Sequence, residues 1–194
     1  MIVAFDASIL VYLLDENAAA PLDPDTNQPV TACRERLNHL VATLARNNGK
    51  IVVPTPALAE VLVKAGSAGP GWLRLLSGSK HFRIAGFDQR AAVECAARQA
   101  ERKVGAARNP GSPRWKPKFD DQIVAIATNE NATIIYSDDS DIAGLAAGRF
   151  QVIGIAALPL PPEKAQADLP FDEPAPLTEP ELEPPAADPD DEQA

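Results

Sequence analysis

Short apolar segments alternate with segments of helical pattern along most of the chain, and this alternation limits the possible folds more than any other feature. The apolar segments include IVAF at 2–5, IVV at 51–53 and TIIY at 133–136. Stretches typical of helices lie between them. Strands that are apolar on both faces and alternate with helices are typical of a parallel sheet covered on both sides. We therefore predict an α/β fold with a mainly parallel sheet.

Capping residues and apolar spacing predict where the single elements begin and end. Thr31 is expected to cap a helix that Gly49 ends, and Asp88 to cap an alanine-rich helix that reaches Lys103. Thr55 and Pro56 are expected as the cap and first position of a helix over 57–64. The other predicted elements are strands at 1–5, 51–53, 82–85, 133–136 and 151–153, helices at 7–14, 72–76, 123–127 and 142–146, and a Gly/Pro loop at 104–118.

Residues 159–194 differ in composition from the rest of the chain. They hold 10 of the 19 prolines and 11 of the 27 acidic residues, with Lys164 as their single base. Such a segment buries too little apolar surface to offset its ordering entropy, so we predict a domain over 1–158 and a disordered tail over 159–194. The tail carries a net charge of about −10, whereas residues 1–158 hold 16 acids and 17 bases. The overall charge of −9 therefore describes the tail, and the domain is compatible with a nucleic acid partner.

The cysteines, the histidines and the N-terminal residues narrow the class of protein further. Cys33 and Cys95 are too few for a disulfide framework, and with His39 and His81 far apart they argue against a His/Cys metal site. The chain opens MIVAF, without the basic and long apolar regions of a signal peptide. No apolar run approaches the roughly 18 residues of a membrane span. We expect a cytoplasmic protein without a membrane segment.

Acidic residues occur at four places near the predicted ends of strands and starts of helices. Asp6 follows the first strand, Asp138, Asp139 and Asp141 follow the strand at 133–136, Asp120 and Asp121 precede the helix at 123–127, and Glu60 lies within the apolar run of the helix at 57–64. Ligands of parallel sheets bind beyond the carboxyl ends of the strands, so these segments are expected to meet at one edge. A set of carboxylates without histidine or cysteine is an oxygen-only site that suits Mg²⁺ or Mn²⁺. Such sites support phosphodiester hydrolysis, in which metal ions activate water and stabilise the leaving oxygen.

Each acidic residue also has a structural interpretation. Asp6 and Asp120 suit helix N-caps, and residues 138–141 suit a solvated turn. Glu60 interrupts an apolar helical run, where an unpaired carboxylate is unfavourable unless it lies on an exposed edge of the helix. Ser8 and Ser137 suit either the orientation of carboxylates or capping and turn roles. From the residues alone, either Asp120 or Asp121 can be the carboxylate that this segment contributes to the site.

A basic stretch leads toward Asp120 and contains one tryptophan. The residues in it that we expect to hold RNA phosphates and to stack a base are Arg108, Arg114, Trp115, Lys116 and Lys118. A solvated helix face followed by a loop is the alternative.

Four motifs in order resemble the PIN-domain family, the nuclease fold that includes the VapC toxins. IVAFDASILVYLL resembles the opening strand, aspartate, hydroxyl residue and helix, and VPTPALAEVL resembles the second motif, whose glutamate falls on Glu60. In KFDDQIVAIA, the family's aspartate is separated from Ile-x-Ala by two residues, which selects Asp120 over Asp121. In TIIYSDDSDI, a hydroxyl residue and D-x-D select Asp139 and Asp141. The segment 66–118 is longer than in compact VapC toxins.

The resemblance implies a three-layer α/β/α domain, Mg²⁺-dependent cleavage of single-stranded RNA, and frequent dimerisation. The implied catalytic residues and metal ligands are Asp6, Glu60, Asp120 and Asp139, with Asp141 as a supporting ligand and Ser8 and Ser137 as supporting residues. We therefore expect a metal-dependent endoribonuclease, the toxin of a type II toxin–antitoxin pair, with an RNA substrate, an antitoxin protein and a second copy of the chain as partners. The alternatives are a non-catalytic PIN-like module that binds RNA or protein, and a phosphotransfer enzyme with Asp6 as nucleophile. The latter needs a second aspartate at the position of Ser8.

Overall fold

A five-stranded sheet, all of whose strand pairs are parallel, forms the centre of the molecule. The computed structural model describes residues 1–105 and 116–162, and all structural statements below refer to these residues. The strands are β1 (Ile2–Phe5), β2 (Lys50–Pro54), β3 (Phe82–Ala85), β4 (Ile134–Tyr136) and β5 (Gln151–Ile153). Their order is β3-β2-β1-β4-β5, with Ala4 of β1 opposite Val52 of β2 and Ile135 of β4. The chain therefore builds the sheet outward from β1, first to one side and then to the other.

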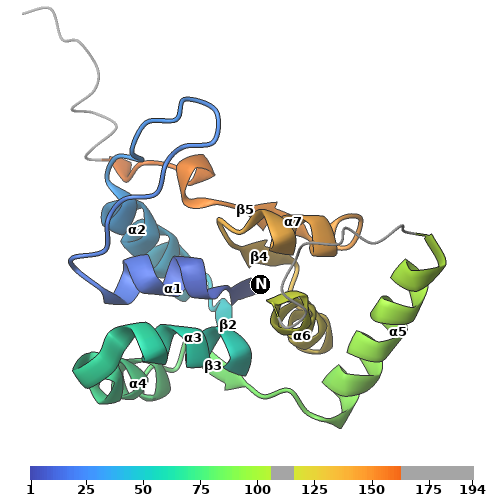
Figure 1. Ribbon diagram of the computed structural model, residues 1–194. Coiled ribbons are helices and arrows are strands. Elements are labelled where there is room, and N and C mark those ends of the chain that lie inside the picture. The colour runs from blue at the N-terminus through green and yellow to red at the C-terminus, as the bar shows by residue number, and fades with distance from the viewer. Residues whose placement is uncertain (106–115, 163–194) are drawn as a thin grey trace, which may run out of the picture.

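Helices cover both faces of this sheet. They are α1 (Ala7–Leu14), α2 (Cys33–Arg46), α3 (Thr55–Ala65), α4 (Gly69–Gly78), α5 (Gln89–Gly105), α6 (Lys116–Asn129) and α7 (Ser140–Ala146), with short 3₁₀ turns at Gly66–Ala68 and Ile155–Ala157. Figure 1 shows α1 to α4 on the left of the sheet and α5 to α7 on the right. Right-handed crossovers require this division, because the direction of sheet growth reverses after β3. The predicted three-layer α/β/α arrangement is confirmed.

The central strands are apolar because helices bury both of their faces. Val3, Ala4 and Phe5 of β1 have no exposed surface, and Ile51 to Val53 of β2 have none either. The Phe5 ring makes edge-to-face contacts with Phe82 and Tyr136, at centroid distances of 6.4 and 5.4 Å. These contacts join β1 to its neighbour β4 and, beyond β2, to β3; Phe5 and Tyr136 are the last residues of β1 and β4.

Several predicted helix boundaries need correction. Thr31 does not cap α2, because Ala32 is the N-cap in a left-handed conformation (φ 53°), and α2 ends at Arg46. Helix α3 begins at Thr55 and its N-cap is Pro54, so Thr55 is the first helical residue and not the cap. The predicted cap at Asp88 is confirmed, since its Oδ1 accepts from the Ala91 N–H at 2.9 Å.

Two further elements are longer than predicted. Gly69–Gly78 is one continuous helix that extends the predicted 72–76 at both ends, despite the glycines and proline at its start. The predicted loop at 104–118 is shorter, because α5 extends to Gly105 and α6 begins at Lys116, ahead of the expected Ile123. The predicted tail falls mostly on residues 163–194, outside the described residues. None of the described helices combines the length and apolar character needed to cross a bilayer.

Candidate functional site

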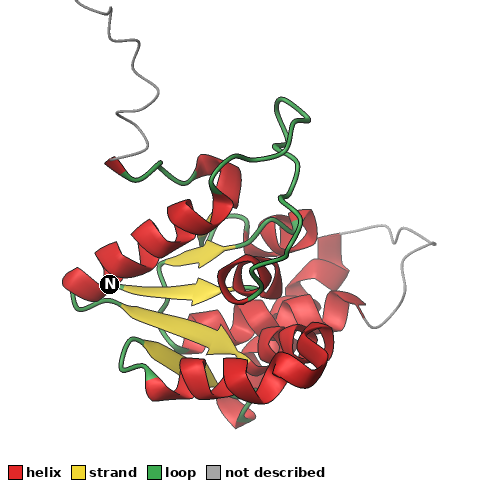
Figure 2. Cartoon of the chain, turned by 90° about the vertical axis from the view of Figure 1, so that its left-hand side faces the viewer, coloured by secondary structure: helices red, strands yellow, loops and turns green. Residues whose placement is uncertain are grey.

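The site lies at the carboxyl ends of β1 and β4, where the direction of sheet growth reverses. The sheet extends from β1 through β2 to β3 on one side, and through β4 to β5 on the other. In parallel sheets this switch point leaves a crevice into which the chain segments after both strands project. Asp6 directly follows β1, and Ser137 and Asp138 directly follow β4. Figure 2 shows the strands side by side and pointing the same way, toward this edge.

Two serine hydroxyls hold the carboxylate of Asp6. The Oγ atoms of Ser8 and Ser137 each donate to Asp6 Oδ2 at 2.9 Å. The same hydroxyls accept from the backbone behind the site: Ser8 Oγ from the Asp138 N–H at 3.1 Å, and Ser137 Oγ from the Asp139 N–H at 3.0 Å. Asp6 is also the N-cap of α1, accepting from the Ser8 N–H. The expected capping role and the expected place at the site edge therefore both hold for Asp6.

Burial makes the ionised forms of Asp6 and Asp138 unfavourable. Burial raises the pKa of Asp6 above its ordinary value of 3.8, although the hydrogen bonds from Ala7, Ser137 and Ser8 act in the opposite direction. Burial also raises the pKa of Asp138, and the nearby Asp6 charge adds to the increase. Two neighbouring carboxylates with raised pKa values form a place where added positive charge is favourable.

A cavity of about 710 Å³ opens beside these carboxylates. Helices α3 and α6 form its walls, and the segment after β4 closes one side. Its lining residues are Asp6, Ser8, Pro56, Ala59, Glu60, Val63, Lys64, Phe119, Asp120, Ile123, Asp138, Asp139 and Ser140. The cavity thus brings together the four acids that the family resemblance assigned to catalysis, with Asp138 as a fifth.

Asp120 and Asp121 point to different surroundings. Asp120 lines the cavity. Because α6 already begins at Lys116, Asp120 lies inside that helix, and the N-cap interpretation of Asp120 is wrong. Asp121 is only 2% exposed, forms an ion pair with Arg102 of α5 and accepts from Gln99 Nε2 at 3.1 Å. Asp121 therefore joins α5 to α6.

Glu60 lies on the cavity wall but in an open position. Its side chain is 58% exposed and forms an ion pair with Lys64, one helical turn later, at 3.1 Å. The apolar run around it therefore does not bury the carboxylate, and the exposed-edge interpretation describes its present position. Lys64 lines the same cavity, so the one described cation among the lining residues is paired with one of its acids.

The acids after β4 divide into separate roles. Asp139 is the N-cap of α7 and accepts from the Asp141 N–H at 2.8 Å. Asp141, for which we expected a supporting role, is not among the residues that line the cavity. Asp138, which the motif comparison passed over, lines the cavity and accepts from the Ile155 N–H at 2.8 Å. A Cβ atom at Gly154 would stand 2.6 Å from Asp138 Oδ1, so the carboxylate needs a glycine there.

The donor set suits a hard divalent cation, although the side chains are not gathered around one. All candidate ligands are carboxylates or hydroxyls, which is the chemistry that Mg²⁺ and Mn²⁺ prefer. Among residues 1–105 and 116–162, no three His, Cys, Asp or Glu side chains stand close enough to form a ready-made metal site. A cation therefore fits these residues only if side chains rotate toward the cavity. Glu60 would then leave its ion pair with Lys64 and bind the cation instead.

The basic stretch is only partly described. Arg108, Arg114 and Trp115 lie outside the described residues, and for Lys116 and Lys118 the backbone of α6 is described without the side chains. Two other cations of the stretch are engaged in packing: Arg98 is buried and donates to the Leu145 carbonyl, and Arg102 pairs with Asp121. The RNA-binding assignments remain predictions.

Solved structures resemble this chain over most of its length. VapBC2 from Rickettsia felis, bound to a DNA fragment from its promoter, matches with a TM-score of 0.53 at 16% identity, over 79% of this chain and 98% of that chain. VapBC from Salmonella typhimurium, bound to DNA, matches at 0.52 and 11%, over 80% and 98%. VapC20 from Mycobacterium tuberculosis, a toxin that cleaves the sarcin–ricin loop, matches at 0.51 and 14%, over 81% and 99%.

No protein-family model and no curated protein matches the sequence. At identities of 11 to 16%, the structural likeness establishes the fold and leaves the chemistry to be argued from the residues.

Proposed function

We propose that this chain, which has the PIN-domain fold of the VapC toxins, is a metal-dependent endoribonuclease that cuts single-stranded regions of RNA. The single observation that carries the proposal is the convergence of acids on one cavity. Asp6, Glu60, Asp120 and Asp139 come from four separate segments, and all four line it. Carboxylates at one edge repel each other, so their common placement on the cavity favours a functional role, although Asp6 and Asp139 also cap helices.

Asp6, Glu60, Asp120 and Asp139 are the residues that would hold Mg²⁺ or Mn²⁺, with Asp138 beside them. A divalent cation at such a site lowers the pKa of water and stabilises the charge that develops on the phosphate oxygens. The chain itself orients the carboxylate: Ser8 and Ser137 fix Asp6 in one orientation through their hydroxyl groups. No side chain is required as a nucleophile.

The same proposal includes partners. The matched structures include VapBC assemblies, and one matched toxin cleaves an RNA loop. We infer that this chain acts as the toxin of a type II pair, that an antitoxin protein covers it, and that it forms a homodimer. Arg108, Arg114, Trp115, Lys116 and Lys118 are proposed to hold the RNA backbone and a base next to the cavity.

The test is cleavage of structured RNA by the purified chain with Mg²⁺ or Mn²⁺ and with EDTA. We expect cuts in single-stranded loops that EDTA abolishes. Asp120→Asn should lower the rate by at least ~10²-fold, as expected when a preorganised electrostatic group is removed. A matched control is Glu130→Gln, an acid directly after the end of α6 that pairs with Arg83 and does not line the cavity. Metal-independent cleavage, or an Asp120→Asn variant with full activity, would contradict the proposal.

One observation favours the alternative of a non-catalytic RNA- or protein-binding module. The described residues hold no ready-made metal cluster. A Mn²⁺ titration followed by calorimetry separates the two functions, since the nuclease requires a saturable site that Asp6→Asn removes. RNA binding without Mn²⁺ binding would support the module.

A further inference from the structure

One wall of the cavity is apolar and open to solvent, although it adjoins the acids. Val63 of α3 is 82% exposed and Phe119 of α6 is 47% exposed, and both line the cavity. Pro56, Ala59 and Ile123 continue the same wall. We call these five residues the apolar wall. Single exposed apolar residues are ordinary on protein surfaces, but an apolar patch inside a polar cavity marks a binding site.

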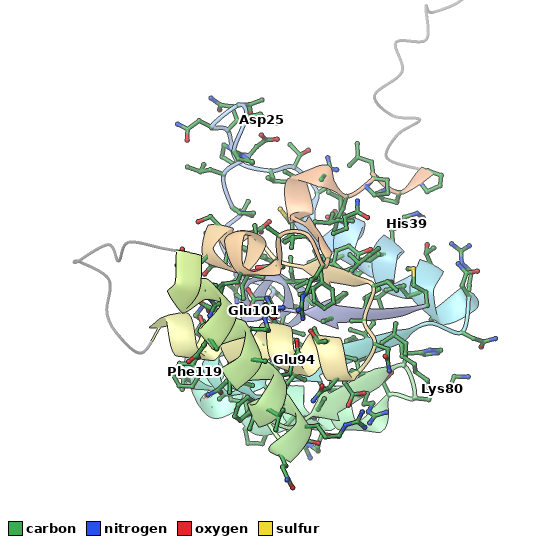
Figure 3. All side chains as sticks on the ribbon, turned by 90° about the vertical axis from the view of Figure 1, so that its right-hand side faces the viewer. Asp25, His39, Lys80, Glu94, Glu101 and Phe119 are labelled. Carbon is green, nitrogen blue, oxygen red and sulfur yellow. The ribbon has the colours of Figure 1, made fainter. Side chains whose placement is uncertain are left out.

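The spacing of these residues places the apolar wall in contact with the carboxylates. On α3, Pro56, Ala59, Glu60 and Val63 recur at three- and four-residue intervals and therefore share one helix face. On α6, Phe119 directly precedes Asp120, and Ile123 follows one turn later. Figure 3 shows Phe119 at the start of α6, on the opposite side of the molecule from Lys80, which precedes β3. The aromatic ring thus stands at the mouth of the site, on the side to which the strands run.

The cavity is too large for the reacting groups alone. Its volume of about 710 Å³ lies in the range of pockets that enclose whole small molecules, and a water molecule occupies only about 30 Å³. On the proposed function, in which the acids hold a divalent cation, a ligand that spans both halves carries an anionic group within a few bonds of an apolar or flat ring. A nucleotide has this form.

We propose that the apolar wall is a nucleobase subsite, in which an unpaired base next to the scissile phosphate stacks on Phe119 and contacts Val63. The inference rests on the proposed nuclease function and specifies its substrate: the base beside the cut is extruded from any helix. Aromatic stacking accepts every base, so the subsite selects single-stranded RNA without selecting a sequence. A base inside a double helix is excluded, because the bases above and below it cover both of its faces and leave neither face for Phe119.

A binding experiment isolates this subsite from the metal chemistry. The probe is a single-stranded RNA of about five nucleotides in which 2-aminopurine is the sole base and methylphosphonates replace the phosphates. The probe is neutral and is not cut, so carboxylate repulsion and catalysis do not enter. We expect the wild-type chain to quench the probe by stacking, Phe119→Leu to weaken its affinity roughly tenfold, and Phe119→Trp to restore it. The matched control is Phe87→Leu, because Phe87 is 38% exposed and does not line the cavity.

Cleavage measurements provide the second arm. With an ordinary single-stranded substrate, Phe119→Leu should lower kcat/KM roughly tenfold, and with a substrate that is abasic on both sides of the cut it should match the wild type. A wild-type chain that fails to quench the probe overturns the subsite, and so does a Phe119→Leu variant that binds it unchanged. The latter result would assign the wall to a protein partner. A chain that quenches the probe but never cuts RNA overturns the nuclease and leaves the subsite standing.

Discussion

Asp6 is the residue on which the hydrogen bonds of the site converge. Its Oδ2 accepts from two serine hydroxyls, and those hydroxyls in turn accept from the backbone N–H groups of Asp138 and Asp139. The orientation of Asp6 is therefore determined by both segments that leave the central strands. This arrangement fixes the side chain but does not remove the unfavourable burial of its charge, which raises its pKa.

A prediction at this scale concerns Asp6 and metal. Mn²⁺ should raise the melting temperature of the wild-type chain, and Asp6→Asn should abolish most of that rise. The pKa of Asp6 is higher in the folded chain than its ordinary value of 3.8. The folded state is therefore destabilised as the pH rises through the folded-state pKa and Asp6 loses its proton. Asp6→Asn removes this loss, so without metal the variant should melt above the wild type at pH 7 and not at pH 3.

Melting curves at the two pH values, with and without Mn²⁺, check both expectations. The control is Asp88→Asn, which changes a helix cap far along the chain and should leave the response to Mn²⁺ intact. A wild-type melting temperature that millimolar Mn²⁺ does not change would count against the metal site.

Lys64 carries a second prediction at the residue scale. Because Lys64 holds Glu60 in an open position, the lysine and a cation compete for the same carboxylate. Lys64→Met should therefore tighten Mn²⁺ binding, by roughly two- to fivefold at low salt, since exposed ion pairs are weak and screened. Isothermal titration measures the change. Lys80→Met removes the same charge on the opposite side of the molecule and should have no comparable effect; weaker binding in Lys64→Met would show that the lysine supports the site.

At the scale of elements, the cavity depends on how α6 is held against its neighbours. Asp120 and Asp121 are adjacent, and the helix directs the first into the cavity and the second toward α5. The ion pair between Asp121 and Arg102 and the hydrogen bond from Gln99 join α5 to α6, while α3 and α6 both contribute residues to the cavity lining. A single helix thus contributes to the packing and to the site through consecutive residues.

This difference gives a prediction about the two aspartates. Asp121→Asn should lower the free energy of unfolding by about 2 kcal/mol, because a buried charge-assisted hydrogen bond is lost, and it should leave the Mn²⁺ response unchanged. Asp120→Asn should leave the free energy of unfolding nearly unchanged and abolish the Mn²⁺ response. Urea unfolding and Mn²⁺ titration of both variants test the pair. If Asp121→Asn is the variant that loses metal binding, the assignment within this motif is wrong by one residue.

The sequence predicted the elements better than their ends, and the site better than its present geometry. The apolar run at 51–53 follows from burial on both faces and lies within β2, and the edge strand Phe82–Ala85 has its predicted bounds. The cap of α2 could not be predicted, because Ala32 has no capping side chain and adopts a left-handed conformation that alanine rarely takes. Asp138 was passed over because its role depends on contact with Gly154 and Ile155, which are distant in sequence. The Glu60–Lys64 pair is local, and its four-residue spacing could have revealed it.

For the whole molecule, the charge is divided between two regions of opposite character. Residues 1–158 are almost neutral, and residues 159–194 carry about −10. The end of the domain is anchored, since Arg36 of α2 donates to the carbonyl of Leu158, whose side chain is buried. Everything beyond this anchor is therefore tethered to the domain at a defined point.

Removal of the residues after Leu158 gives the prediction at this scale. The truncated chain should stay folded, because its core residues are retained, and it should bind single-stranded RNA more tightly than the full chain at low salt. A tethered polyanion competes with RNA phosphates at an effective concentration that can reach millimolar, and salt screens this competition. RNA affinities of both chains at about 50 and 300 mM salt measure it. Equal affinities at low salt would show that the tail serves solubility and does not compete.

The close approach of Gly154 to Asp138 has an evolutionary consequence. Gly154 has an ordinary negative φ of −83°, so backbone freedom does not require glycine there; the requirement is the space that the Asp138 carboxylate occupies. No mutation to a larger residue is neutral at position 154 while Asp138 keeps its place, and a loss of Asp138 removes the constraint at once. The two positions should therefore covary among descendants of this gene. A homologue with a side chain at 154 is expected to have moved or lost the carboxylate at 138.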